Sequence, residues 1–300
     1  MTKKIGFVGL GTMGSIMAKR LLIYGYSLNV WNRTRDKCDS LVNMGASISS
    51  SPAEIAEICD VVFTMTTDSN ASKEVILGKN GILAGAKKGL IIIDTASIAP
   101  EATRLHAKKA DEKGVALLDA PVSGGPKVAE NGSLGIMVGG SKKAFEQTKY
   151  ILEELGSLVI YTGSSGNGST LKLIANLVMG VTIQASAEAI VLANKIGIDP
   201  QLIIDITSLP GTGPQTGAMA TRGPRMIAKD FYPPHFSANN MHKDLYEVLQ
   251  LGKAHGVSLP SATTSLKILS KLIDCGDGSI DSSAIVNVIE KLSSSSKVIN

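Results

Sequence analysis

The sequence predicts an α/β protein with a doubly wound, mostly parallel sheet in its N-terminal part and an all-helical C-terminal part. Short apolar runs alternate with helical patterns in the first half of the chain, whereas only helical patterns occur after Gly168. The chain has 300 residues, 44% of them hydrophobic, which is enough for two domains with separate cores. We expect these domains to cover residues 1–165 and 166–300 and to be linked by a long helix.

The strands and helices of the first domain follow one another along the chain. We expect strands at Lys4–Val8, Leu28–Trp31, Asp60–Thr64, Leu90–Ile93 and Val115–Leu118. We expect helices at Ser15–Ile23, Pro52–Ile58, Pro100–Glu112 and Lys142–Leu155. This alternation is typical of βαβ units, whose ligand sites lie at the carboxyl ends of the parallel strands.

The linking helix follows a loop rich in glycine, serine and asparagine at Gly163–Gly168. Ser169 or Thr170 is its expected N-cap, and Gly197 is its expected stop. Its segment Leu173–Ala193 is apolar enough to resemble a membrane span, but it is interrupted by Asn176, Gln184 and Glu188. We interpret it as a buried helix of a soluble protein and expect no membrane partner.

The remainder of the second domain is expected to be helical, with a glycine- and proline-rich excursion at Leu209–Pro234 and a helix over Met241–Gly252. The stretch Gly276–Ser279 with Asp281 is superficially similar to a calcium loop. Its ligand spacing does not fit, so we interpret it as a helix cap.

Composition excludes several classes of function. The net charge is only +4 and aromatic residues make up 4%, which argues against nucleic-acid binding. The three cysteines are widely spaced, as expected for reduced thiols in the cytoplasm, and the four histidines show no metal-ligand pairing. We therefore expect a cytoplasmic protein without a metal site.

A glycine motif follows the first predicted strand and precedes the first predicted helix. Its residues are Gly9, Leu10, Gly11, Thr12, Met13 and Gly14. The G-x-G-x-x-G spacing permits a tight turn and close approach of a pyrophosphate to the helix N-terminus. A glycine-rich turn in any βα unit is the alternative, but the context predicts a Rossmann-type dinucleotide-binding domain.

The end of the second strand bears on cofactor choice. An acidic residue there would favour NAD(H), whereas this chain has Asn32, Arg33 and Thr34. A guanidinium and a hydroxyl suit a 2′-phosphate, so we expect NADP(H) to be preferred, with NAD(H) possible. Alternatively, Thr34 caps the next helix and Arg33 is solvated.

Two further segments place polar groups where a substrate could bind. Ser123, Gly124 and Gly125 follow the fifth strand, and their main-chain N–H groups would form an anion cradle, although a plain turn is the alternative. Lys172 and Asn176 are four residues apart and share one face of the long helix. A half-buried lysine there is paired, reaches to water, or takes part in chemistry.

Taken together, these segments resemble the β-hydroxyacid dehydrogenase family, which includes 3-hydroxyisobutyrate dehydrogenases, tartronate semialdehyde reductases and NADPH-linked glyoxylate/succinic semialdehyde reductases. A more distant relative is 6-phosphogluconate dehydrogenase. The resemblance covers nearly the whole chain. It rests on four motifs in order, at Gly9–Gly14, Asp119–Gly125, Gly163–Asn176, and Phe236 with Lys243-Asp244.

The resemblance implies a role for each matching residue. Lys172 would be the catalytic acid/base, and Asn176 would help to hold the substrate. The substrate carboxylate would be bound by Ser123, Gly124 and Gly125. The remaining matches imply that Phe236 and Asp244 line the site and that Lys243 lies by the cofactor. The resemblance also implies a homodimer or homotetramer.

One departure from the family is visible before the proline at position 100. The family usually has D-x-S-T there, but this chain has Ala96 and Ser97 in place of the last two residues. Ser97 keeps a hydroxyl for the nicotinamide ribose, whereas the contact at Ala96 is lost.

We expect hydride transfer between the cofactor and a small carboxylated aldehyde or β-hydroxy acid. A lysine can supply the proton for the carbonyl oxygen if burial lowers its pKa toward neutrality. One alternative is an imine reductase, which is disfavoured by Lys172 because such enzymes usually replace this lysine. The other is a catalytically silent, nucleotide-binding regulatory protein.

Overall fold

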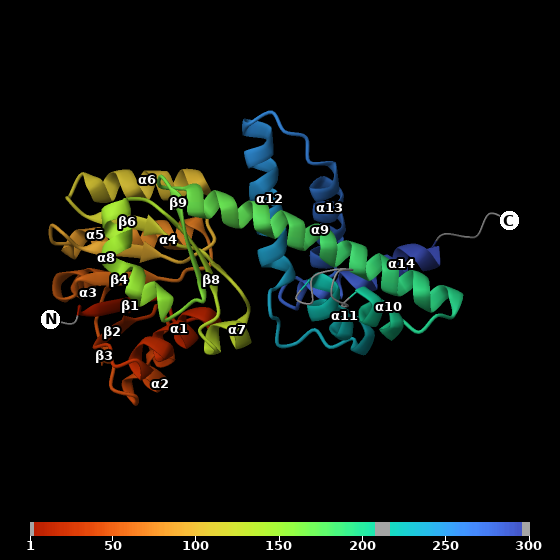
Figure 1. The fold of residues 1–300 in the computed structure, drawn as a ribbon, viewed down its shortest axis with the longest axis horizontal. Coiled ribbons are helices and arrows are strands. Elements are labelled where there is room, and N and C mark those ends of the chain that lie inside the picture. The colour runs from red at the N-terminus through yellow and green to blue at the C-terminus, as the bar shows by residue number, and fades with distance from the viewer. Residues whose placement is uncertain (1–2, 208–216, 296–300) are drawn as a thin grey trace. The chain divides into compact units, whose positions relative to one another are not determined.

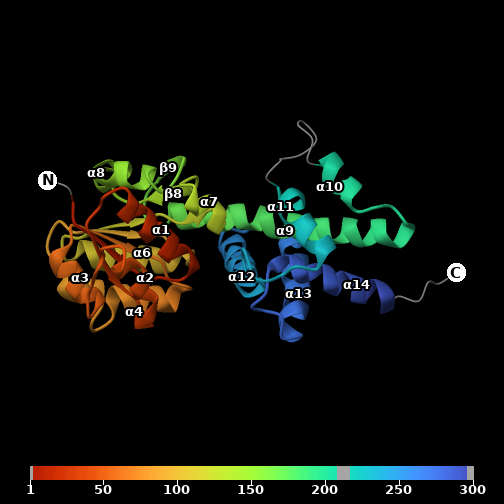
Figure 2. The same ribbon diagram turned by 90° about the horizontal axis from the view of Figure 1, so that it is seen from below.

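The structure is a computed structural model that describes residues 3–207 and 217–295 (Figure 1). The chain forms two compact units, Met1–Lys172 and Leu173–Asn300. The division falls within helix α9 (Asn167–Ile196), a single long helix in both views (Figures 1 and 2).

One nine-stranded sheet organises the described part of the first unit. Its strands run in the order β3-β2-β1-β4-β5-β6-β8-β7, and β9 pairs with β8. The pairs from β3 to β6 are parallel, whereas β8 is antiparallel to β6 and β7. The strands are β1 (Ile5–Val8), β2 (Leu28–Trp31), β3 (Ser47–Ile48), β4 (Val61–Thr64), β5 (Ile91–Asp94), β6 (Ala116–Asp119), β7 (Val122–Ser123), β8 (Gly135–Gly139) and β9 (Leu158–Gly163).

Successive residues of the central strands enter two different cores. Phe7 of β1 and Phe63 of β4 stack in one core, whereas Val8 and Val62 belong to the other. A strand whose side chains alternate between two buried faces is apolar throughout, which is why the sequence shows unbroken apolar runs. The expected doubly wound sheet is confirmed.

Helices cover this sheet. They are α1 (Thr12–Ile23), η1 (Arg35–Cys38), α2 (Asp39–Val42), α3 (Pro52–Ile58), α4 (Ser69–Leu77), α5 (Ile82–Gly85), α6 (Pro100–Asp111), α7 (Pro126–Glu130) and α8 (Lys142–Glu153). The sequence did not predict the helices η1, α2, α4, α5 and α7 or the strands β3, β7, β8 and β9. Strands β3 and β7 have two residues each, and β8 begins and ends with glycine, so their sequence signals are weak.

The second unit is helical in its described part, as expected. After α9 it contains α10 (Gln201–Thr207), α11 (Ala218–Ala228), α12 (Ala238–Ala254), α13 (Pro260–Asp274), η2 (Ser282–Ala284) and α14 (Ile285–Ser295). Helices α12 and α13 lie side by side in both views (Figures 1 and 2). Residues from α9, α11, α12, α13 and α14 share one apolar core.

The predicted excursion at Leu209–Pro234 needs correction. Residues 209–216 lie outside the described residues, but α11 occupies much of the remainder, with Pro224 inside it. Ala218 and Met226 are buried in the core of the unit. Burial of an apolar face outweighed the helix-breaking tendency of glycine and proline, on which the prediction relied.

The start of α9 also differs from the expectation. The helix begins at Asn167, so neither Ser169 nor Thr170 precedes its first turn. Its end is as predicted, at Ile196 before Gly197, which has φ +77°. Among the described helices, α9 is long and apolar enough to cross a membrane by length and composition. One such helix is a weak indication, because the core helix of a soluble protein passes the same test. The expected burial of this helix is only partial, since 39% of its apolar window is buried.

Candidate active site

The glycine motif forms the turn from β1 into α1. Gly9 has φ +95°, and a Cβ on Gly14 would lie 2.0 Å from the carbonyl oxygen of Gly9, so side chains at these positions would break the turn. A Cβ on Gly11, in contrast, would meet nothing within 4 Å. No side chain of the described residues caps the N-terminus of α1. The turn therefore leaves main-chain N–H groups and open space for a phosphate, as a dinucleotide requires.

Asn32 holds this turn in place. Its Oδ1 accepts a hydrogen bond from the Leu10 N–H at 2.8 Å, and its Nδ2 donates to the Thr34 carbonyl at 2.7 Å. Both ends of the side chain are thus engaged with main chain. Asn32, which the sequence predicts to bind the cofactor, therefore also supports the glycine turn.

Arg33 is exposed, and it has no hydrogen bond or ion pair with any described residue. Thr34 precedes η1, but its side chain makes no capping hydrogen bond to the described chain. The hydrogen bond that a Thr34 helix cap would make is therefore absent from the described chain, and the alternative role of Thr34 is not supported. The Arg33 guanidinium remains available to an anionic group.

A buried polar network supports the loop after β5. The carboxylate of Asp94 accepts hydrogen bonds from the hydroxyls of Thr64 at 2.8 Å and Ser72 at 2.9 Å, and from the Ala96 N–H at 3.2 Å. Burial raises the pKa of Asp94, and these three donors oppose the rise. Ala96 is itself buried, whereas Ser97 is half-buried. The network holds the loop that carries Ser97.

Ser123, Gly124 and Gly125 follow the carboxyl end of β6. Ser123 ends β7, where it pairs with Gly135 of β8, and its side chain is exposed. Gly124 has φ +128°, and Gly125 directly precedes α7. The N–H groups of both glycines lack an acceptor in the described chain. This exposed hydroxyl and the two N–H groups are what the predicted anion cradle requires.

Asp119, the first residue of the same motif, has a different function in the structure. Its Oδ1 and Oδ2 accept hydrogen bonds from the N–H groups of Gly166 and Ser169, each at 2.9 Å. The carboxylate is therefore the cap of α9, in place of the expected Ser169 or Thr170 side chain. Burial raises the pKa of Asp119, and the two N–H donors oppose the rise.

Lys172 lies three residues after Ser169 on α9, and its side chain is buried with 8% exposure. Asn176, four residues further on, is also buried and donates from Nδ2 to Oδ2 of Asp244 at 2.5 Å. Asp244 belongs to α12 and is fully buried. A hydrogen bond within the second unit thus connects Asn176 and Asp244, which are 68 residues apart in the sequence. The family resemblance implied that both residues belong to the same site.

Lys243 contacts the same carboxylate. Its Nζ lies 3.3 Å from Oδ1 of Asp244, but this oxygen makes no hydrogen bond of good geometry to the described residues. We therefore regard the contact as an ion pair without a directed hydrogen bond. The remaining expected lining residue, Phe236, is half-buried against the apolar core of the second unit.

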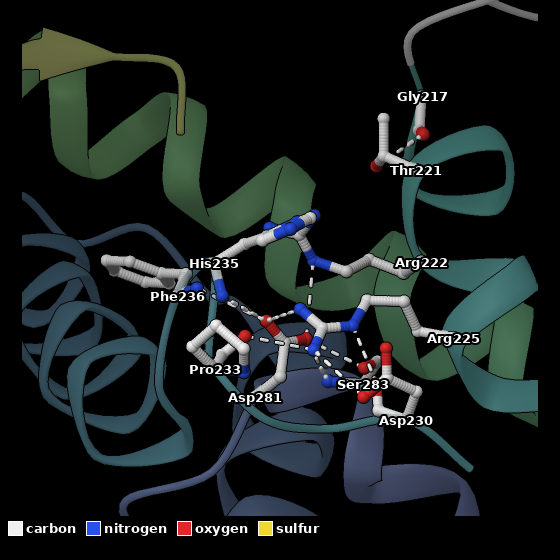
Figure 3. Close-up of polar contacts among 10 residues, drawn as sticks. All are labelled: Gly217, Thr221, Arg222, Arg225, Asp230, Pro233, His235, Phe236, Asp281 and Ser283. Carbon is white, nitrogen blue, oxygen red and sulfur yellow. Dashed lines mark hydrogen bonds and ion pairs between the residues drawn. The ribbon is translucent and has the colours of Figure 1, made fainter. Parts of the chain in front are cut away.

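A cluster that sequence analysis missed supports Phe236 (Figure 3). Asp281 is fully buried and accepts hydrogen bonds from the N–H groups of His235 at 2.8 Å and Phe236 at 3.2 Å. Asp281 also caps η2 through Ser283, as the sequence predicted. Arg222 and Arg225 reach toward it from α11. No sequence pattern relates α11 to residue 281, so this cluster could be recognised only from the tertiary structure.

Among the described residues, no group of three or more His, Cys, Asp or Glu side chains could hold a metal ion. The open, uncapped turn at Gly9–Gly14 is arranged for a dinucleotide. The fold and the glycine turn define an NAD(P)-dependent oxidoreductase.

Comparisons with known proteins identify the family. Residues 4–163 match the NAD-binding domain of 6-phosphogluconate dehydrogenase, and residues 166–289 match the NAD-binding domain of NADP-dependent 3-hydroxyisobutyrate dehydrogenase. The chain belongs to the β-hydroxyacid dehydrogenase family. Its relatives are dehydrogenases and reductases of hydroxyacids, so this chain is an NAD(P)-dependent oxidoreductase.

Three relatives match over most of their length. Glyoxylate/succinic semialdehyde reductase 1 of Arabidopsis thaliana is 36% identical, over 96% of this chain and 98% of that protein. 2-Hydroxy-3-oxopropionate reductase of Escherichia coli is 35% identical, over 96% and 97%. 2-(Hydroxymethyl)glutarate dehydrogenase of Eubacterium barkeri is 34% identical, over 96% and 95%.

Solved structures agree with this assignment. 3-Hydroxyisobutyrate dehydrogenase from Salmonella typhimurium has a TM-score of 0.86 at 29% identity, covering 95% of this chain and 99% of that one. An imine reductase from a Pseudomonas species has a TM-score of 0.65 at 20% identity, covering 96% and 100%. At that identity the second likeness concerns the fold alone.

Proposed function

We propose that this enzyme transfers a hydride between NADP(H) and a small carboxylated aldehyde, interconverting the aldehyde with its β-hydroxy acid. The observation that carries the proposal is the pair Lys172 and Asn176, buried and four residues apart on α9, with Asn176 bonded to the buried Asp244. A buried lysine on the same face of α9 as a hydrogen-bonded asparagine fits a group that transfers a proton to or from a bound substrate.

Each residue has one proposed task. Gly9–Gly14 would hold the pyrophosphate, Ser97 and Lys243 would contact the cofactor, and Arg33 would bind the 2′-phosphate of NADP(H). The bound nicotinamide supplies or accepts the hydride. Ser123, Gly124 and Gly125 would bind the substrate carboxylate through a hydroxyl and two N–H groups.

Lys172 would handle the proton. As the aldehyde carbon receives the hydride, its oxygen gains negative charge, and the Lys172 ammonium donates a proton to that oxygen. In the reverse direction the lysine amine takes the hydroxyl proton. Asn176 would orient the substrate, and Phe236 and Asp244 would line the site.

NADPH absorbance tests the proposal directly. The purified full-length protein is incubated with NADPH and, in turn, glyoxylate, succinic semialdehyde, tartronate semialdehyde and methylmalonate semialdehyde. The reverse reaction is measured with NADP⁺ and 3-hydroxyisobutyrate or 2-(hydroxymethyl)glutarate. We expect turnover with carboxylated substrates and weaker turnover with aldehydes that lack a carboxylate, such as propionaldehyde.

Two other outcomes would favour other functions. Turnover of a cyclic imine without turnover of any aldehyde would indicate an imine reductase. NADPH binding without turnover of any of these compounds would indicate a regulatory protein.

A further inference from the structure

Arg20 of α1 connects three helices of the first unit. Its Nη1 donates to the carbonyl of Glu130, the last residue of α7, at 2.9 Å, and its Nε donates to the carbonyl of Glu154, directly after α8, at 2.5 Å. Its Nη2 donates to the hydroxyl of Tyr24 at 2.9 Å, and its guanidinium carbon lies 5.0 Å from the centre of that ring. All three nitrogens are therefore used, and every partner belongs to the first unit.

The contact with α7 completes the C-terminal end of that helix. The carbonyls of residues 127–129 accept hydrogen bonds from main-chain N–H groups of the following turn, but the carbonyl of Glu130 accepts none from the described main chain. A cation is favourable at this position, because the last carbonyls of a helix carry partial negative charge. A Cβ on Gly132 would lie 2.0 Å from the Arg20 guanidinium, so the guanidinium lies directly against the turn.

The other end of α7 adjoins the proposed carboxylate cradle. Gly125 directly precedes α7, and its carbonyl accepts hydrogen bonds from the N–H groups of Val128 and Ala129, each at 3.0 Å. A Cβ on Gly124 would lie 2.7 Å from Cγ1 of Val128, so the main chain of Gly124 packs closely against the helix. Because α7 has only five residues, a displacement of its C-terminal end also displaces these two glycines.

The helix that carries Arg20 also begins at the proposed cofactor site. Helix α1 starts at Thr12, within the glycine turn, and lies against α7 (Figure 1). Arg20 follows about two turns later on the same helix. One helix therefore has the cofactor turn at its first end and the contact with α7 near its second.

We propose that Arg20 is a positioning residue, which fixes α7 and with it the carboxylate cradle at Ser123–Gly125 relative to the glycine turn. The inference rests on the proposed function, because that function assigns the substrate carboxylate to this cradle. Arg20 acts on the substrate only through α7. Its loss should therefore weaken binding of the carboxylate and leave the hydride transfer itself nearly unchanged.

Hydrogen exchange tests the inference without any turnover. The measurement uses the full-length protein with NADP⁺ and mass spectrometry of its peptides. In Arg20→Gln, exchange should be ~10-fold or more faster at the N–H groups that hold α7 and its turn, because a charge-assisted bond is lost. These groups belong to Val128, Ala129, Gly132 and Ser133.

Two further variants show which property of Arg20 matters. Arg20→Lys should restore part of the protection, because a positive charge remains near the end of α7. Tyr24→Phe should exchange like the parent, because it leaves the bonds from Arg20 to Glu130 and Glu154 in place. Unchanged exchange at α7 in Arg20→Gln would overturn the inference.

Leu83→Ala is the matched control for a general loss of stability. Leu83 of α5 is buried in the core of the first unit that contains no residue of α1 or α7. We expect a lower Tm with exchange at α7 like that of the parent. Faster exchange at α7 in both variants, in proportion to their Tm, would show that Arg20 acts only through overall stability and would also overturn the inference.

Kinetics separate this inference from the proposed function. With NADPH, the ratio of kcat/KM for glyoxylate to that for propionaldehyde should fall ~3–10-fold in Arg20→Gln, through a higher KM for glyoxylate. The Kd for NADPH should stay within a few-fold of the parent value, and Leu83→Ala should keep the parent ratio.

Faster exchange with an unchanged ratio would show that α7 does not position the cradle, which would refute the inference and leave the dehydrogenase function intact. Absence of turnover by the parent with every substrate would refute the dehydrogenase function. The exchange measurement would then still decide whether Arg20 holds α7 and the segment before it.

Discussion

The carboxylate of Asp119 accepts a hydrogen bond from the main-chain N–H of Ser169, three residues before Lys172. Asp119 ends β6, and four residues later the chain reaches Ser123, the start of the proposed anion cradle. A single buried side chain therefore ties the helix that carries the proposed proton donor to the strand that leads to the proposed carboxylate site.

We predict that Asp119→Asn lowers both stability and kcat. An amide presents one oxygen and one NH₂ to the N–H groups of Gly166 and Ser169, so one hydrogen bond is lost and two donors face each other. The loss of a charge-assisted bond should cost ~1.5–3 kcal/mol, measured by urea unfolding. Because the change displaces Lys172 and leaves the glycine turn intact, kcat should fall more than the affinity for NADPH.

Thr103→Val is the control for the Asp119 variant. The Thr103 hydroxyl lies 3.0 Å from that of Ser169, so this variant also removes a contact to the start of α9, but a neutral one. We expect a loss of only ~0.5–1.5 kcal/mol. An Asp119→Asn enzyme with unaltered kcat would show that the cap does not position Lys172.

Replacement of Lys172 tests the proton donor. We predict that Lys172→Ala lowers kcat by ~10²–10⁴, the usual contribution of a general acid, and changes the Kd for NADPH by no more than a few-fold. Steady-state kinetics and a fluorescence titration of NADPH measure the two effects. Lys195→Ala, at the exposed end of the same helix, should behave like the parent. Near-native turnover without Lys172 would exclude the mechanism.

Cofactor preference depends on Arg33 in our proposal. We predict that Arg33→Ala weakens NADPH binding by a factor of ~10 to 150, equivalent to ~1.5–3 kcal/mol, and leaves NADH nearly unaffected. Arg35 and Lys37 are also exposed and could compensate in part, so the lower half of the range is expected. Both cofactors are titrated at one ionic strength, because salt screens such contacts.

Arg35→Ala is the matched control for Arg33 and should have a smaller effect on NADPH binding. Equal losses for NADPH and NADH in Arg33→Ala would instead indicate that Arg33 packs against the part of the cofactor that both share. A parent enzyme that prefers NADH would refute the proposed preference outright.

The stability of the protein should depend on pH through His106. This ring is buried with 1% exposure, and its Nδ1 lies 3.4 Å from the Ser72 hydroxyl of the Asp94 network. Burial lowers its pKa below 6.5, and Lys73 adds to the effect. The unfolded chain therefore binds a proton that the folded chain does not, and stability is lost as the pH falls below about 6.5.

Urea unfolding at pH 7.5 and pH 5.5 measures this effect. The parent should lose stability on acidification, and His106→Gln should lose less, because the ring is absent. His235 and His242, whose pKa values are also lowered by burial, contribute equally to both proteins and cancel in the comparison. The same pH dependence in the parent and the variant would show that His106 does not titrate differently on folding.

The sequence by itself determined the features whose causes are local. The turn at Gly9–Gly14 depends on backbone space at single residues, and the central strands depend on unbroken apolar runs, so both could be predicted. The N-terminal cofactor domain, the long helix and its end before Gly197 followed from the same signals. The resemblance implied that Asn176 and Asp244 belong to one site, but nothing in the sequence predicted the hydrogen bond between them.

The tertiary structure decided which polar groups face one another. Asp119 and Ser169 are 50 residues apart, and Arg222 and Asp281 are 59 apart, so no periodicity of either segment could connect them. The short strands β3 and β7 and helix α11 likewise exist because neighbouring segments supply the hydrogen bonds or the apolar surface that their own sequences lack. Contacts of this kind depend on burial and on the packing of distant segments, which the chain acquires only when it folds.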